Sequence, residues 1–410
     1  MDIYLVGGAV RDGLLGRPTR ERDWVVVGAT AAELESRGYQ SVGKDFPVFL
    51  HPDTREEYAL ARLERKVAPG YRGFTIDFSP SVTLEQDLAR RDLTINAMAR
   101  DSSGQIIDPF GGRTDLDKQV LRHVSSAFVE DPVRILRVAR FIARFASLGF
   151  AVAPETMKLM RQMVESGEAD ALVPERVWRE LSRALDEPTP RAAIELLRDT
   201  GALRVVLPEL NALFGVPQRP EWHPEIDTGE HTLLALQVAA ARNASQAVRF
   251  AVLVHNLGKA LTPKAEWPRR HAHETLGLPA IEALCARLRV PQEHRELGLL
   301  TSRFHTQVHR GLELQTNTLL ELLEHCDAFR RPARFAEMLE ACECDARGRL
   351  GFADKPYPQR ARVEQAFDIA RGISLVESER AGLDGAAIGE RLRSKRVSAL
   401  QRGPQIAKDE

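Results

Sequence analysis

A chain of 410 residues is too long for one ordinary hydrophobic core, so its length predicts several packed domains. Its 43% hydrophobic and 28% charged residues exclude a disordered chain and are typical of a folded globular protein. The formal net charge of -1 excludes a uniformly basic coat for nucleic acid, so any affinity for RNA must come from local groups of arginines.

The sequence also bears on where the protein works. No apolar run approaches the roughly 20 residues that span a bilayer, and the N-terminal segment MDIYLVGGAVRD leaves no room for the core of a signal peptide. We therefore expect a cytoplasmic protein with no membrane partner. The cysteines lack paired CxxC spacing, which favours free thiols over a disulfide framework or a zinc ribbon; they are Cys285, Cys326, Cys342 and Cys344.

The predicted elements change character along the chain. The first part alternates short β-rich runs with glycine turns and a short helical segment at 31–37, which predicts an α/β domain. Its predicted strands are 3–6, 24–27, 48–51 and 58–63. From about Asp131 helical periodicity takes over, with prolines near the helix starts, and the rest reads as all-α. The first of these predicted helices are 132–145, 154–165, 174–185 and 190–200, and the polar stretch 391–410 is expected to fray.

A glycine pair follows the first predicted strand. Gly7 and Gly8 would let backbone amides approach a phosphate, and Arg11 adds a fixed positive charge nearby. A simple tight turn is the alternative for this pair taken alone.

Two acidic residues flank the next strand. Glu21 and Asp23 are two apart, so on a strand both carboxylates point to the same side and can hold one hard cation such as Mg²⁺. Paired carboxylates of this kind bind the metals of phosphoryl-transfer sites. A solvated acidic turn remains the alternative.

Arginines gather on one face of the predicted helix 132–145. At about 100° per residue, Arg134, Arg137, Arg140 and Arg144 form one stripe, which suits phosphates or base edges as well as a solvated face. Asp131 stands at the start of this helix, where acidic residues are also common as plain caps.

Taken together, four motifs resemble those of the class II tRNA nucleotidyltransferases, the CCA-adding enzymes, in their bacterial form with a C-terminal HD domain. The motifs are GGAVRD, the acidic pair before DWVVVG, RRDLTINA and EDPVRILRVARF. The resemblance implies an α/β, polymerase-β-like nucleotidyltransferase head over 1–130, followed by all-α parts. These are a helical neck and body that bind nucleotide and tRNA over 131–220, an HD-like domain over 221–330, and a helical tail over 331–410.

The resemblance also implies an activity, the addition of CCA to the 3′ end of tRNA from CTP and ATP with release of pyrophosphate. Glu21 and Asp23 would be the catalytic residues and would bind Mg²⁺, and Asp131 with Arg134 would read the base edge. The remaining nucleotide-binding residues would be Gly8, Arg11, Arg91, Arg137 and Arg140. Most members of the family carry aspartate at the position of Glu21; glutamate keeps the charge and the oxygen ligands, so we expect activity to survive.

The histidines of the third part resemble a metal site of the HD phosphohydrolases, in which a transition metal such as Ni²⁺ activates water. The candidates are His231, His255, Asn256 and His305. The family's His-Asp pair reads His255-Asn256 here, and the neutral amide should weaken metal binding. The sequence therefore leaves two alternatives for this domain. It has a weak phosphatase, 2′,3′-cyclic phosphodiesterase or 2′-nucleotidase activity, or its histidines only pack or bind RNA phosphate.

Two rival functions remain open. A poly(A) polymerase shares the same head but would accept only ATP, and an HD phosphohydrolase would use the head only as a binding module. The partners implied are tRNA, CTP and ATP, with a monomer and a homodimer both open.

Overall fold

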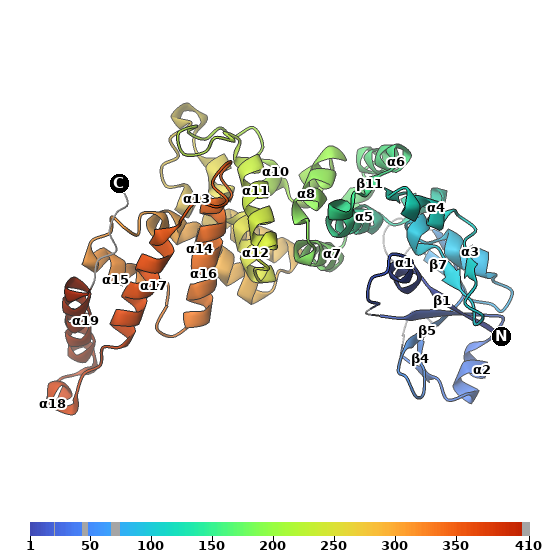
Figure 1. The fold of residues 1–410 in the computed structure, drawn as a ribbon, viewed down its shortest axis with the longest axis horizontal. Coiled ribbons are helices and arrows are strands. Elements are labelled where there is room, and N and C mark those ends of the chain that lie inside the picture. Colours follow the sequence, from blue (N-terminus) through green and yellow to red (C-terminus); the bar gives the residue numbers. More distant parts are fainter. Residues whose placement is uncertain (20, 43–47, 67–73, 404–410) are drawn as a thin grey trace. The chain divides into compact units, whose positions relative to one another are not determined.

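The computed structural model describes residues 1–19, 21–42, 48–66 and 74–403, except that the side chains of 64–66, 74 and 75 are not described. The chain forms two compact units, Met1–Val206 and Leu207–Glu410 (Figure 1). The finer division into four domains stays a prediction.

The first unit is built on a mixed β-sheet with the strand order β3-β4-β5-β2-β1-β8-β9. β1 runs antiparallel to β2 and β8, whereas β2 runs parallel to β5. The remaining strands pair outside this sheet, β6 with β7 and β10 with β11. The strands are β1 Asp2–Val6, β2 Asp23–Val27, β3 Gln40–Ser41, β4 Val48–Leu50, β5 Glu57–Leu60, β6 Leu63–Lys66, β7 Phe74–Asp77, β8 Ala99–Arg100, β9 Ile106–Ile107, β10 Val120–Leu121 and β11 Ala151–Val152.

Alternation along β2 places a hydrophobic cluster on each face of the sheet. Val25 packs with Val6 and Leu88, while its neighbour Val26 packs with Leu34 and Phe49. Because both faces are covered, the backbone is held firmly where β1 ends and β2 begins, at the cavity described below.

Helices complete the first unit, and α5 packs against both α7 and α8. Proline stands at the first turn of α6, α7 and α8, as predicted, since its missing N–H costs nothing there. The helices are α1 Gly8–Leu14, α2 Ala31–Ser36, α3 Leu84–Ala89, α4 Gly112–Asp117, α5 Val133–Phe145, α6 Pro154–Glu165, α7 Pro174–Asp186, α8 Pro190–Asp199 and α9 Ala202–Val206.

The second unit is helical throughout its described residues. α11, α12, α14 and α16 pack on one another, and α13 lies against α14 and the short 3₁₀ turn Leu257–Leu261 (Figure 1). The helices are α10 Pro208–Asn211, α11 Thr228–Ala241, α12 Gln246–Val254, α13 His273–Leu288, α14 Gln292–His309, α15 Thr316–His325, α16 Pro332–Arg347, α17 Pro358–Arg371, α18 Glu377–Arg380 and α19 Gly385–Arg402.

Most of the sequence predictions about secondary structure are confirmed, with three differences. The predicted strand 58–63 ends at Leu60, and a separate strand begins at Leu63. Helix α1 starts at Gly8, so the glycine pair opens a helix directly. The expectation that 391–410 frays is wrong as far as 402, because α19 packs on α17 and buries Leu400; residues 404–410 lie outside the described residues.

Two expectations from composition can also be compared with the structure. All four cysteines are buried free thiols. Within the described ranges, no helix combines the length and the apolar character needed to cross a membrane.

Candidate active site

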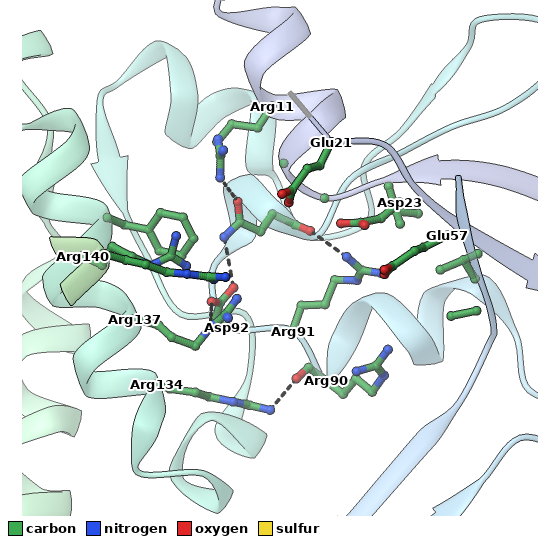
Figure 2. A pocket seen from close by; sticks show the side chains of 18 of the residues that line it. Arg11, Glu21, Asp23, Glu57, Arg90, Arg91, Asp92, Arg134, Arg137 and Arg140 are labelled. Atoms are coloured by element: carbon green, nitrogen blue, oxygen red, sulfur yellow. Dashed lines mark hydrogen bonds and ion pairs between the residues drawn. The ribbon is translucent and has the colours of Figure 1, made fainter. Parts of the chain in front are cut away.

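A cavity of about 1400 Å³ lies in the first unit, and every residue predicted to bind metal or nucleotide there lines it (Figure 2). These residues come from the start of β2, from helices α1 and α5, and from the segments just before β2, just before α5 and just after α3. They are Gly8, Arg11, Glu21, Asp23, Arg91, Asp131, Arg134, Arg137 and Arg140.

The acidic side of the cavity is formed where β2 begins. Asp23 is the first residue of β2 and Glu21 precedes the strand; their carboxylates turn toward the same space (Figure 2). The protein around Asp23 removes part of its hydration and raises its pKa, and the charge of Glu21 adds to this effect while Arg91 opposes it.

A third carboxylate, which the sequence analysis missed, stands beside this pair. Glu57 is the first residue of β5 and is the parallel partner of Asp23 across the sheet, and it also lines the cavity. Its position directly before the predicted strand 58–63 was a signal, but only the β2–β5 register places it opposite Asp23. Three carboxylates at the starts of two neighbouring strands offer the hard oxygen donors that suit Mg²⁺, so the donor set fits the predicted metal.

The turn between β1 and α1 brings backbone close to the cavity. Gly7 has a φ of +68°, and a Cβ built there would lie 3.0 Å from Arg91 Nη1, so a side chain would be strained and crowded. Arg11 is buried under this turn: its Nη1 donates to Asn96 Oδ1 at 2.5 Å and its Nε to Asp12 Oδ1 at 2.9 Å. It therefore lines the cavity as a held charge rather than as a mobile side chain.

The arginine stripe of α5 is anchored by buried acids. Arg137 Nε donates to Asp92 Oδ2 at 2.7 Å, and Arg140 Nε donates to Glu180 Oε2 of α7 at 2.7 Å. Although burial by itself disfavours the charged carboxylate, Arg137 and a hydrogen bond from Asn96 hold the pKa of Asp92 below its ordinary value. Glu180 was missed by the sequence analysis, because only the packing of α7 on α5 brings it to Arg140.

The predicted base-reading pair has partners of its own. Arg176 of α7 donates to both carboxylate oxygens of Asp131, at 3.1 and 2.7 Å. Arg134 donates to the main-chain oxygens of Ala127 at 2.8 Å and Arg90 at 2.6 Å. Both residues line the cavity as predicted, but Asp131 is engaged by an arginine that the sequence analysis did not single out.

In the second unit two of the predicted histidines, together with His309, contact one aspartate. Asp345 Oδ1 lies 2.7 Å from His231 Nε2 and 2.9 Å from His255 Nε2, and Asp345 Oδ2 lies 2.7 Å from His309 Nε2. Burial alone would raise the pKa of Asp345, but these imidazoles hold it well below its ordinary value. Asp345 was not among the predicted ligands, since it lies 114 positions from His231.

The other two predicted residues of this cluster differ in their contacts. His305 hydrogen-bonds with His273 (Nε2 to Nε2, 3.2 Å) rather than with Asp345, and its ring lies 5.1 Å from that of His255. Asn256 is fully buried, and neither polar atom of its side chain has a hydrogen-bond partner. In addition, His223, Glu225 and His231 offer ligand atoms within 4.8 Å of one another, so the region can present a metal site.

Comparison with known proteins places both units in one family. Residues 3–122 match the family model described as the poly A polymerase head domain, and residues 149–214 match that of the probable RNA- and SrmB-binding site of polymerase A. A multifunctional CCA protein of Thioalkalivibrio sulfidiphilus is 59% identical over 401 residues, 98% of either chain. Another, from Alkalilimnicola ehrlichii, is 60% identical over 98% of this chain and 97% of its own.

Three solved structures share the fold at low sequence identity. The Bacillus stearothermophilus CCA-adding enzyme in complex with CTP is 24% identical, with a TM-score of 0.64 over 98% of this chain and 89% of that one. A CCA-adding enzyme with ATP is 21% identical, with a TM-score of 0.64 over 97% and 86%. The Thermotoga maritima enzyme complexed with tRNA is 22% identical, with a TM-score of 0.60 over 100% and 88%. The predicted fold class, a nucleotidyltransferase head followed by all-α domains, is confirmed.

Proposed function

The chain belongs to the family of multifunctional CCA proteins, and from this we propose that it is a tRNA nucleotidyltransferase that adds C, C and A to the 3′ end of tRNA in the cytoplasm. It would use CTP and ATP and release pyrophosphate. The single observation that carries the proposal at the level of the site is that all nine residues predicted to bind metal or nucleotide line one cavity.

The acidic edge of the cavity supports a metal-assisted reaction. We propose that Glu21 and Asp23 hold Mg²⁺, with Glu57 close enough to share the task, because the strand register brings these carboxylates to one place. Bound there, Mg²⁺ would supply Lewis-acid stabilisation of the attacking and leaving oxygens at the α-phosphate of the nucleotide. Glutamate at position 21 keeps both oxygen ligands, which supports retained activity.

The basic side of the cavity supports binding of a triphosphate. Arg91, Arg137 and Arg140 all line it, and the last two are held in place by Asp92 and Glu180. Guanidinium groups fixed by buried acids stay oriented, so little side-chain entropy is lost when phosphate oxygens bind them. The role we propose for these arginines is to bind the phosphates and the sugar.

We propose that Asp131 and Arg134 read the Watson-Crick edge of the base, as an amino-acid template. A carboxylate and a guanidinium together present acceptors and donors, and a wrong base would leave buried polar groups unpaired. Asp131 is paired with Arg176, so base reading has one of two requirements. Arg176 releases one carboxylate oxygen of Asp131, or Arg176 itself faces the base together with Asp131 and Arg134.

A poly(A) polymerase, the rival function, would have the same head and the same metals. The family model of the head bears that enzyme's name, but relatives at 59% and 60% identity over nearly the whole chain are multifunctional CCA proteins. This coverage favours CCA addition.

Incorporation of single labelled nucleotides tests the proposal. With Mg²⁺, CTP is expected to enter tRNAs that end before CCA or after the first C, and ATP only a tRNA that ends in CC. ATP entering any RNA end would support a poly(A) polymerase, and no incorporation would contradict the assignment of the head.

For the second unit we propose a transition-metal site of reduced affinity at His231, His255 and Asp345. The orphaned side chain of Asn256 supports this, because its amide oxygen can approach a cation but brings no charge. Phosphohydrolase activity at this site, with a metal such as Ni²⁺, would accordingly be weak.

A further inference from the structure

The two ring nitrogens of His231 face two different carboxylates. Nε2 lies 2.7 Å from Asp345 Oδ1, where it forms a hydrogen bond, and Nδ1 lies 2.7 Å from Glu225 Oε1. A carboxylate only accepts hydrogen bonds, so the proton of the neutral imidazole lies on Nε2 and is donated to Asp345. The lone pair of Nδ1 is therefore left on the side of Glu225.

Nδ1 is also the nitrogen of His231 that lacks a hydrogen bond. His231 is fully buried, and among the described residues no group forms a hydrogen bond of normal geometry with Nδ1, although Glu225 Oε1 is close. Polar atoms buried in proteins are normally paired. Two acceptor atoms at this distance repel each other, whereas a cation bound to both would hold them together. A bound cation therefore accounts for the short distance and for the absent hydrogen bond.

His223 completes a set of three ligands. Its Nδ1 lies 3.1 Å from Glu225 Oε1, and its ring lies 4.5 Å from the ring of His231 at an angle of 81°. One ligand atom from each of the three side chains lies within 4.8 Å of the other two. Two imidazoles and one carboxylate are a ligand set of catalytic zinc sites, which keep a fourth position open for water. The donor types and their spacing therefore both suit Zn²⁺.

The backbone around Glu225 fixes the position of its carboxylate. Glu225 Oε2 accepts from the main-chain N–H of Leu350 at 3.0 Å, and the main-chain N–H of Ile226 donates to the oxygen of His223 at 2.9 Å, which closes a turn around Glu225. Ile226 has a φ of 61°, a conformation that β-branched residues rarely adopt. Strain of this kind persists where the surrounding contacts enforce it, and it is common at binding sites.

We propose that His223 Nδ1, Glu225 and His231 Nδ1 form a Zn²⁺ site that is distinct from the site proposed above at His231, His255 and Asp345. A neutral imidazole has one lone pair, so a metal at His231 Nδ1 leaves the Nε2–H group to Asp345, as in the structure, whereas a metal at Nε2 would replace that hydrogen bond. Zn²⁺ binding releases to solvent the proton that His223 Nδ1 donates to Glu225, because a ligating ring nitrogen carries no proton. His223 and Glu225 are only partly buried, so the ion can enter from solvent and keep water as its fourth ligand.

Equilibrium dialysis of the full-length protein against buffered Zn²⁺ tests the proposal. The two sites share only His231, so single substitutions separate them. His223→Gln and Glu225→Gln are each expected to weaken Zn²⁺ binding about 10–100-fold or more, since even the loss of an outer contact costs a metal site that much. His255→Gln is expected to leave this binding unchanged. His325→Gln, at the exposed end of α15, is the matched control and should behave as the unmodified protein.

Nitrogen NMR of protein labelled at histidine gives a second answer without a substitution. Zn²⁺ should shift the Nδ1 signals of His223 and His231 and leave Nε2 of His231 protonated. Neither measurement depends on the incorporation of nucleotides.

Two results would overturn the proposal. If His255→Gln weakens Zn²⁺ binding and the NMR places the metal on Nε2 of His231, then His223 and Glu225 only orient His231 for the other site. If neither His223→Gln nor Glu225→Gln changes Zn²⁺ binding, a second ring proton on His231, rather than a metal, accounts for its contact with Glu225.

Discussion

At the scale of single residues, the account depends on the carboxylates at the start of β2. Asp23 lies in the sheet register between Val6 and Glu57, so its position is set by backbone pairing on both sides. Glu21 lies before the strand and has only the local chain to hold it. We therefore expect Asp23 to matter more than Glu21.

Asp23→Asn removes one negative charge from the proposed metal site and keeps the shape of the side chain. Incorporation of CTP and ATP is expected to fall by about 10²–10³-fold or more, the range seen when one stabilising group of a transition state is removed. Initial rates over a series of Mg²⁺ concentrations measure the effect.

Two variants serve as controls for this experiment. Asp53→Asn, in an exposed turn of the same sheet, should change nothing, and Glu21→Asp should retain incorporation because both oxygen ligands remain. Full activity of Asp23→Asn would contradict the proposal that Asp23 holds Mg²⁺.

At the scale of elements, α5 is joined to the RRDLTINA segment by an ion pair between the buried Asp92 and the partly exposed Arg137. Asp92 accepts from Arg137 at 2.7 Å and from the Asn96 side chain at 3.1 Å. This contact ties the arginine stripe to the RRDLTINA segment, so the same residues would serve both stability and the proposed nucleotide binding.

Asp92→Asn is expected to lower the free energy of unfolding by about 2 kcal/mol at pH 7, less than the cost of breaking a fully buried pair, because Arg137 is partly exposed and keeps Glu180 nearby. The pKa of Asp92 is lower in the folded protein than the unfolded value of about 4. Its contribution is therefore complete above about pH 4 and is lost as the pH falls through the lowered folded pKa.

Urea unfolding of the unmodified protein and the variant between pH 7 and pH 3 measures this difference, which should shrink at the acid end. Asp117→Asn, at an exposed position of α4, should change the free energy of unfolding by less than about 0.5 kcal/mol. A difference that does not depend on pH would contradict the assignment of the effect to the Asp92 carboxylate.

At the scale of the whole molecule, the second unit gathers histidines of the proposed metal site around Asp345 but carries a neutral amide at position 256. Asn256→Asp is expected to raise the affinity for Ni²⁺ or Zn²⁺ by about tenfold or more, because a charged ligand joins the cluster. The metal retained after desalting, measured by elemental analysis, gives the result without relying on activity.

Asn317→Asp, on the exposed face of α15, adds the same charge away from the cluster and should retain no more metal than the unmodified protein. If Asn256→Asp retains no more metal either, the weakness of the site has another cause than the missing carboxylate.

Sequence reasoning was sufficient where the signal is local. The strand at 24–27, the glycine turn and the arginine stripe of α5 each depend on residues a few positions apart, and each is present in the structure. Sequence reasoning failed where segments that are far apart in the chain come into contact. Glu57 depends on the β2–β5 register, Glu180 on the packing of α7 on α5, and Asp345 on a contact across 114 positions. The end of the strand at Leu60 was also missed, since no turn residue marks it.

The most direct test of the central claim is to sequence the 3′ ends formed when a tRNA lacking CCA is incubated with all four nucleoside triphosphates and Mg²⁺. We expect ends that read CCA and stop there, because one cavity in the first unit would select C twice and A once. Runs of A on these ends would contradict the account and indicate a poly(A) polymerase.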